Sequence, residues 1–233
     1  MKVLGIETAT AVCAAAISID GVVASEELIE QNYVHAEKLL GLIDRSMRRA
    51  SVSLADLNGV AVSIGPGSFT GLRIGLSVAK GIVYGRGLPL LGVPTLEALA
   101  CATRLTKGAP AGSDILAIID ARRDDVYCQL FSPDRDRCIP VWEARDLTLP
   151  DLVRDLSDRS VTVTGDAVPK FAAFVRTHPG VRQGQFRFLD HDRARCSAGS
   201  VAVLASERLA GGAVDDPAIL EPKYIKEFFL KTR

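Results

Sequence analysis

The spacing of hydrophobic residues predicts a regular alternation of strands and helices in the first half of the chain. Short apolar and β-branched runs indicate strands, and Asp20-Gly21 is typical of a two-residue hairpin turn. Longer stretches with apolar residues three or four positions apart indicate helices. The predicted strands are 2–7, 12–19, 22–29, 59–65 and 89–93, and the predicted helices are 35–50, 70–85 and 95–104, the last capped by Thr95.

The second half opens with the same pattern and then becomes less regular. The stretch "DILAIIDARRDDVYCQLFSP" at 114–133 predicts a strand, a charged turn and an alternating strand. A strand at 160–164 and helices at 168–177 and 197–209 follow. Strands that meander and then alternate with helices are typical of a mixed sheet covered by helices. The repeat predicts a duplicated α/β architecture with a cleft between its halves.

A loop-like stretch, "TKGAPAGS" at 106–113, separates the two halves. We expect an N-terminal lobe over 1–105, which binds partners, and a C-terminal lobe over 106–233. The amphipathic tail "EPKYIKEFFLKTR" is expected to dock back on the N-terminal lobe.

The composition is that of an ordinary globular protein. Of 233 residues, 48% are hydrophobic, and Lys plus Arg (28) equal Asp plus Glu (28). This balance provides no overall electrostatic attraction to nucleic acid or membrane. Glu7 interrupts the N-terminal apolar run too early for a signal peptide, and the five cysteines form no CxxC pair. We therefore expect a cytoplasmic protein without membrane association.

The segment "SIGPGSFTGLRIG" at 63–75 places glycines between a strand and a helix. It lacks the lysine of a phosphate-binding P-loop, the spacing of a dinucleotide fingerprint, and the first glycine of a nucleophile elbow, where Pro66 stands. A tight strand-to-helix turn, with Ser68 or Thr70 as the helix N-cap, is favoured over phosphate binding.

The two helices at 35–50 and 70–85 carry more apolar or small surface than a single contact needs. Gly71, Gly75 and Ala79 are four positions apart, which leaves one face nearly bare and favours close packing against another helix, of this chain or of a partner. On this hypothesis, Gly75→Leu blocks partner binding while the chain stays folded. The broad apolar arc of the 35–50 helix likewise indicates a second contact.

Acidic and basic groups offer candidate ligand contacts. Glu7 and Thr8 end the first strand, where actin-like ATPases carry an acid and a phosphate-binding turn, but Ala9 replaces the glycine that such a turn needs. Arg122 and Arg123 lie in a charged turn that is either a solvated hairpin or a binding edge facing the cleft. The three histidines lack metal-ligand spacing, so no metal site is expected.

Five motifs together resemble the TsaB (YeaZ) family of bacterial tRNA threonylcarbamoyladenosine biosynthesis proteins. They are "VLGIETAT", "GPGSFTGLRIGLSVAKGI", "GVPTLEALA", "IDARRDDVY" and "EPKYI". The resemblance is clear through residue 130 and thin from 140 to 215. It implies an actin-like ATPase fold (Hsp70/actin/sugar-kinase type), α/β, with two related lobes of mixed sheets covered by helices.

The resemblance also implies a function within a complex. Such a protein binds and activates the catalytic subunit TsaD and, with the ATPase TsaE, supports transfer of threonylcarbamoyl from its adenylate to N6 of adenosine 37 in ANN-reading tRNAs. ATP is used by the complex and no cofactor by the isolated chain. TsaD carries a His-x-x-x-His metal site, and the corresponding residues 92–102 contain no histidine. This implies a non-catalytic subunit, a pseudo-enzyme without a metal.

In this family the helices at 35–50 and 70–85 resemble those that pack against TsaD, and alone the same surface is expected to form a homodimer. The predicted partner-binding residues are His35, Leu39, Leu42, Gly71, Leu72, Arg73, Gly75, Leu76 and Ala79. The candidate nucleotide or tRNA contacts are Glu7, Thr8, Arg122 and Arg123. The alternative function is an ATP-dependent kinase or ATPase that acts alone. A metallopeptidase is discouraged by the histidine count.

Overall fold

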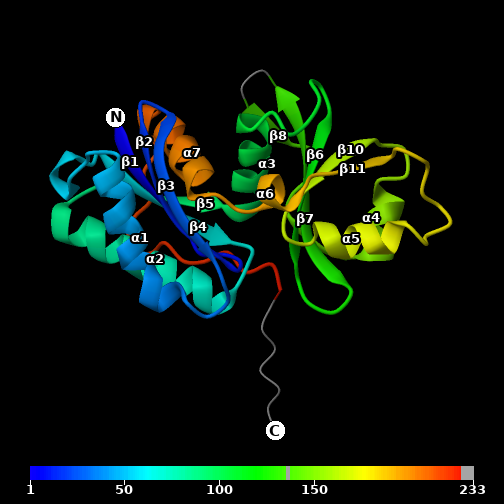
Figure 1. Ribbon diagram of the computed structural model, residues 1–233, viewed down its shortest axis with the longest axis horizontal. Helices are drawn as coiled ribbons and strands as arrows, with labels where there is room; N and C mark the ends of the chain where they lie inside the picture. The colour runs from blue at the N-terminus through cyan, green and yellow to red at the C-terminus, as the bar shows by residue number, and fades with distance from the viewer. Residues whose placement is uncertain (135–136, 227–233) are drawn as a thin grey trace, which may run out of the picture.

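The computed structural model describes residues 1–134 and 137–226 and consists of two α/β lobes that lie side by side (Figure 1). The first lobe is built on a five-stranded sheet in the order β3-β2-β1-β4-β5. Its strands are β1 (Lys2–Glu7), β2 (Val12–Ile19), β3 (Val22–Glu30), β4 (Gly59–Gly65) and β5 (Leu90–Pro94). Helices α1 (His35–Arg49) and α2 (Phe69–Arg86) cover one face of this sheet, and a 3-10 turn, η1 (Leu54–Asp56), precedes β4.

The second lobe is built on a sheet in the order β11-β10-β6-β7-β8, with β9 paired to β7. Its strands are β6 (Asp114–Asp120), β7 (Asp125–Asp134), β8 (Arg137–Pro140), β9 (Arg145–Thr148), β10 (Val161–Thr164) and β11 (Phe186–Phe188). Helices α4 (Leu149–Asp155) and α5 (Val168–Val175) pack on its outer face. The short helix α6 (His191–Ala194) leads back toward the first lobe.

The two sheets repeat one topology. In the first, β1 pairs antiparallel with β2 and parallel with β4; in the second, β6 pairs antiparallel with β7 and parallel with β10. In each sheet the next strand out on either side continues the same sense of pairing. This repeat confirms the predicted actin-like α/β fold of two related lobes.

The boundary predicted for the C-terminal lobe needs correction at its far end. Helix α7 (Ala198–Ala210) lies on the first sheet, on the face opposite α1 and α2. A side chain at Gly5 would meet the Ala198 carbonyl oxygen at 2.3 Å, and Ser18 Oγ and Ser206 Oγ are 2.8 Å apart. The first lobe therefore takes residues from both ends of the chain, because its second sheet face is apolar and requires a cover.

Residues beyond α7 also return to the first lobe. The Asp215 amide donates to the Leu90 carbonyl at 2.9 Å, and the Lys223 amide donates to the Ile64 carbonyl at 2.7 Å. The described part of the tail, up to Lys226, therefore runs from the amino end of β5, at Leu90, to the carboxyl end of β4, at Ile64. The predicted docking of residues 227–233 lies outside the described residues.

Helix α3 (Thr95–Leu105) joins the lobes. Its Leu96, Leu99 and Ala100 share one buried cluster with residues of β2 and β6. The predicted cap at Thr95 is wrong: Pro94 is the N-cap residue, and Thr95 Oγ1 instead accepts from the Gly65 amide at 3.1 Å. The Thr95 hydroxyl therefore accepts a hydrogen bond from the end of the neighbouring strand β4, and not from an amide of its own helix.

Candidate functional site

The small residues of α2 face the end of β1. A Cβ at Gly71 would meet the Thr8 carbonyl oxygen at 2.1 Å, and one at Gly75 would meet Thr8 Oγ1 at 2.2 Å. Ser68 Oγ accepts from the Gly71 amide at 3.2 Å, so Ser68 is the N-cap of α2. The glycines thus allow a helix to approach a strand of the same chain, where the sequence predicted a second helix.

This packing corrects most of the predicted partner-binding set. Five of the predicted residues of α2 are buried in the chain's own core: Gly71, Leu72, Gly75, Leu76 and Ala79. Within α1, His35, Leu39 and Leu42 are buried as well. The His35 ring Nε2 lies 3.0 Å from the Thr10 carbonyl oxygen, which joins α1 to the turn after β1. These residues pack within the lobe and are almost entirely shielded from solvent.

A different set of residues forms the outer surface of α1 and α2. Leu40 is 62% exposed and Tyr84 is 92% exposed, although both are large apolar side chains. The outer α1/α2 face comprises Ala36, Leu40 and Gly41 of α1 with Arg73, Ser77, Gly81 and Tyr84 of α2. Of the predicted partner-binding residues, Arg73 alone belongs to this face. Exposed apolar groups on two adjacent helices are typical of a protein interface.

The turn after β1 is filled by protein atoms. Glu7 and Thr8 are fully buried. Glu7 Oε1 accepts from the Ala9 amide at 2.6 Å and from Ser63 Oγ at 3.0 Å, and the Ser68 amide donates to the Ala9 carbonyl at 2.7 Å. Burial raises the pKa of Glu7 to about 7. Neighbouring residues shield both side chains from the solvent, so the ligand contact of Glu7 and Thr8 stays a prediction that this packing does not favour.

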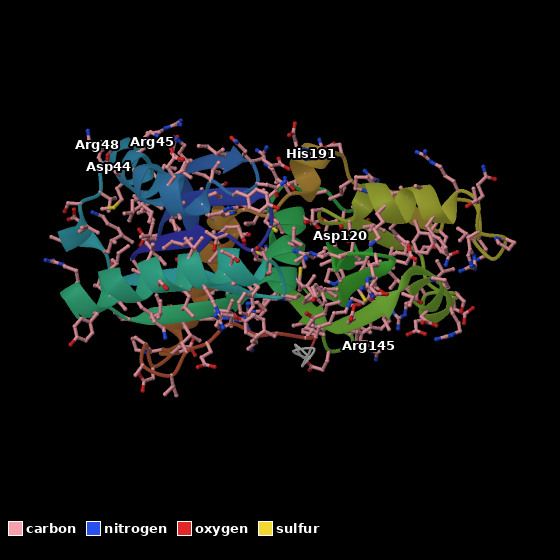
Figure 2. The ribbon with its side chains drawn as sticks, turned by 90° about the horizontal axis from the view of Figure 1, so that it is seen from below. Asp44, Arg45, Arg48, Asp120, Arg145 and His191 are labelled. Atoms are coloured by element: carbon pink, nitrogen blue, oxygen red, sulfur yellow. The ribbon has the colours of Figure 1, made fainter. Side chains whose placement is uncertain are left out.

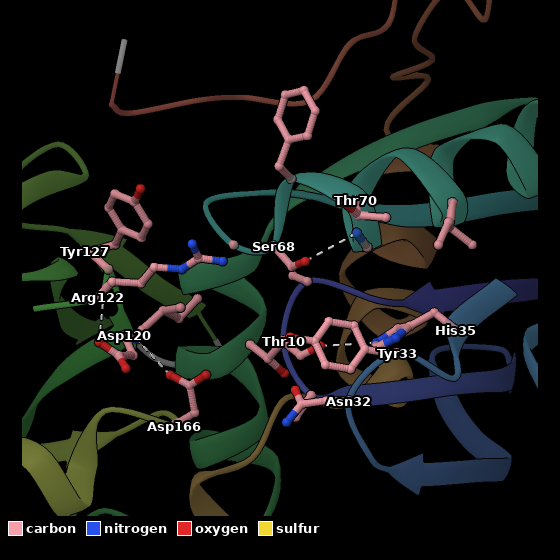
Figure 3. A pocket seen from close by; sticks show the side chains of 18 of the residues that line it. Thr10, Asn32, Tyr33, His35, Ser68, Thr70, Asp120, Arg122, Tyr127 and Asp166 are labelled. Atoms are coloured by element: carbon pink, nitrogen blue, oxygen red, sulfur yellow. Dashed lines mark hydrogen bonds between the residues drawn. The ribbon is translucent and has the colours of Figure 1, made fainter. Parts of the chain in front are cut away.

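The cleft between the lobes has a volume of about 1000 Å³. Arg122 and Arg123 line it from the turn between β6 and β7, and Arg122 points across it toward the loop that carries Ser68 (Figure 3). Both have left-handed backbone, with φ of 69° and 51°, a region that residues other than glycine rarely adopt. Neither forms an ion pair with a residue of the described chain. The charged turn therefore forms part of the cleft wall.

Carboxylates on the second lobe surround that turn. Asp120 Oδ1 accepts from the Arg122 amide at 2.9 Å and from Lys170 Nζ at 2.8 Å. Asp166 Oδ1 accepts from the Asp120 amide at 2.9 Å (Figure 3). Asp166 touches solvent from a recess in the cleft wall, and the protein atoms around it raise its pKa to about 6. The cleft is therefore mixed in charge.

Among the residues of the cleft wall that sequence reasoning missed are Asp166, Tyr33 and Lys226. Asp166 lies two residues after β10, whose carboxyl end points toward the cleft as parallel strand ends in such sheets do, so its position carried a signal. Tyr33 and Lys226 also line the cleft, and neither lies in a pattern that marks a site. Among the described residues, no three His, Cys, Asp or Glu side chains gather as a metal-binding group.

Comparison with known proteins assigns the chain to a family. A family model described as TsaD, tRNA N6-adenosine threonylcarbamoyltransferase, matches residues 23–137. The tRNA threonylcarbamoyladenosine biosynthesis protein TsaB of Escherichia coli (strain K12) is 36% identical over 168 residues, which cover 70% of this chain and 71% of that protein. The chain belongs to the TsaB family.

Solved structures agree on the fold of this TsaB family member. The structure described as YeaZ from Pseudomonas aeruginosa superposes with a TM-score of 0.80 at 24% identity, over 96% of this chain and 99% of that one. A further relative, the tRNA N6-adenosine threonylcarbamoyltransferase of Paracoccus denitrificans (strain Pd 1222), is 45% identical over 76 residues, which are 33% of this chain and 21% of that protein. In the described part of this TsaB family chain, none of the helices has the length and apolar character that a membrane crossing requires.

Proposed function

We infer that the chain acts in tRNA threonylcarbamoyladenosine biosynthesis as a non-catalytic subunit that binds and activates a TsaD-type transferase. A TsaE-type ATPase takes part, ATP is used by the complex, and tRNA is reached through the complex. The observation that carries this inference is the outer α1/α2 face, with Leu40 and Tyr84 open to solvent in a member of the TsaB family. The reaction takes place in the cytoplasm.

The chemistry of the chain supports a binding role. Glu7, which ends β1, accepts hydrogen bonds from the Ala9 amide and from Ser63 Oγ. The Ser68 amide donates to the Ala9 carbonyl in the turn that follows. A phosphate needs free backbone amides at such a turn. The chain therefore lacks the usual means of holding ATP for a reaction of its own.

The outer α1/α2 face suits a helical partner. Gly41 and Gly81 have no side chain and so form shallow depressions in this face. A Cβ at Gly81 would meet no atom of the described residues within 4 Å. Large exposed side chains such as Tyr84, next to shallow depressions, are typical anchors of protein interfaces. In the absence of TsaD, the same face brings two copies of this chain together as a homodimer.

The test is threonylcarbamoyl transfer to tRNA by TsaD and TsaE, supplied with threonylcarbamoyl adenylate and ATP, with and without this chain. We expect transfer to require the chain, and Leu40→Glu or Tyr84→Ala to weaken TsaD binding at least tenfold, since each removes an interface anchor. Val22→Glu is the matched control, because Val22 is 69% exposed on β3, away from this face.

The second candidate function is an ATP-dependent kinase or ATPase of the same fold that acts alone. The cleft favours it, together with Arg122 and Arg123, which have no ion-pair partner within residues 1–134 and 137–226. Full transfer without the chain, together with ATP turnover by the chain alone that is lost in Arg122→Ala, would replace the first function with this one.

A further inference from the structure

The last described residues cross from one lobe to the other. Tyr224 lies against the start of α2, where its ring centroid is 5.2 Å from that of Phe69 and its hydroxyl accepts from Arg73 Nε at 3.2 Å. The Arg73 guanidinium lies over the Phe69 ring at 3.9 Å. Just before Tyr224, the Lys223 carbonyl oxygen approaches Gly65 so closely that a Cβ there would meet it at 2.6 Å. The tail is thus held firmly on the first lobe.

Two residues further on, the tail reaches the second lobe. Lys226 Nζ lies 2.7 Å from Asp125 Oδ2 and 3.1 Å from Asp146 Oδ2, and 5.9 Å from the Tyr127 ring centroid. Asp125 begins β7 and Asp146 lies in the paired strand β9. Lys226 also lines the cleft. Lys226 therefore forms ion pairs with two carboxylates of the second lobe, whereas Tyr224, two residues earlier, is held on the first lobe.

The other contacts between the lobes lie elsewhere. Helix α3 packs between the two sheets, and His191 Nε2 lies 2.9 Å from Glu30 Oε1 where α6 meets the end of β3. Figure 2 shows His191 and Arg145 on opposite sides of the molecule, with Asp120 between them. Asp146, which pairs with Lys226, follows Arg145 in the chain. The tail therefore closes the side of the cleft opposite the His191 contact.

We propose that residues 223–226 form a strap that sets the angle between the lobes and hence the width of the cleft. The chain crosses between the lobes at 106–113 and 195–197, and two such crossings leave a hinge free to open. The strap adds a third, non-covalent crossing whose lysine is partly exposed, so it can release without unfolding either lobe. Its anchor on Arg73 belongs to the outer α1/α2 face, so a partner on that face touches the strap directly.

Pulsed electron spin resonance on the full chain tests the strap. Spin labels are placed at Arg48→Cys, at the outer edge of the first lobe (Figure 2), and at Arg176→Cys after α5, with Cys138→Ser because Cys138 is the free cysteine that is not buried. Dilution with unlabelled chain removes distances between copies. We expect one narrow distance distribution, and at least a twofold broader one in Lys226→Ala.

Two further variants separate the strap from general damage. Lys2→Ala removes an ion pair with Asp56 inside the first lobe and is expected to leave the distribution narrow. Lys226→Arg keeps a positive charge toward both carboxylates and is expected to leave the distribution narrow. The proposal is overturned if Lys226→Ala keeps the narrow distribution, or if Lys226→Arg broadens it as much as Lys226→Ala does. Because this measurement needs no partner, it is independent of the proposed function.

Discussion

Glu7 is an acidic side chain that the fold keeps away from water. One carboxylate oxygen accepts hydrogen bonds from the Ala9 amide and Ser63, while Oε2 is buried and has no hydrogen-bond partner among the described residues. An ionised carboxylate in such a place is unfavourable, because it loses the hydration it has in the unfolded chain. The neutral acid avoids that cost, which is why burial raises the pKa of Glu7 to about 7.

Because of this shift, the free energy of unfolding falls as the pH rises. The unfolded chain loses the Glu7 proton near pH 4.5 and the folded chain near pH 7, so the favourable contribution present at low pH is lost as pH rises through that range. The full loss amounts to roughly 3 kcal/mol. Glu7→Gln keeps an acceptor oxygen and does not ionise, so its free energy of unfolding should lack this fall.

Urea denaturation of both proteins at pH 5 and pH 8 measures the difference. We expect the wild-type chain to lose about 2–3 kcal/mol more than Glu7→Gln over this range. Parallel changes in the two proteins would contradict the assignment, because the other groups that titrate here, such as Asp166, are common to both.

Helix α2 presents two kinds of glycine on two faces. Gly75 lies inside, against Thr8, and Gly81 lies outside with open space where a side chain would be. The same residue type therefore serves close packing at one position and leaves the outer surface low at the other. Glycine lowers helix stability at both positions, by about 1 kcal/mol relative to alanine.

Alanine at these two positions should act in opposite directions. Gly75→Ala forces its Cβ against Thr8 Oγ1 and is expected to destabilise the chain by about 1–2 kcal/mol, since overpacking outweighs the gain in helix propensity. Gly81→Ala meets nothing and should stabilise the isolated chain by about 0.5–1 kcal/mol. Chemical denaturation of the two variants measures both effects. Stabilisation by Gly75→Ala would mean that α2 stands away from β1.

The same packing changes the expectation for Gly75→Leu. The larger side chain should impair folding itself, whereas the sequence-based hypothesis had the chain stay folded and lose only partner binding.

The first lobe of the whole molecule depends on residues far away in the chain. Its sheet is complete by Pro94, yet the face formed by Val3, Ala61 and Val93 is covered by α7. Apolar surface of this kind must be removed from water for the sheet to be stable. The lobes are consequently not independent segments that could be cut apart at residue 105.

A charge buried in α7 should therefore loosen the first sheet. Ala205→Glu places a carboxylate among the residues of that face and is expected to cost several kcal/mol. Amide hydrogen exchange in β1 and β4 should accelerate, while that in β6 and β10 changes less. Ala210→Glu, on an exposed position of the same helix, is the matched control. Faster exchange confined to the second sheet would place α7 in the other lobe.

The sequence alone determined the elements up to residue 105 and their order, because alternation and helical spacing are local properties that each strand and helix carries in its own residues. In the second half it missed β8, β9, α4, β11 and α6, which are too short to show a clear period. It also predicted the duplicated fold and, through Ser68, the start of α2. Only the tertiary structure decided which face of α1 and α2 is buried, because both helices have apolar or small residues on more than one side. Leu39 lies inside and Leu40 outside, a choice made by the sheet beneath them. The closure around Glu7, the position of α7 and the bridge from Lys226 to Asp146 likewise join distant residues, and no local pattern encodes those contacts.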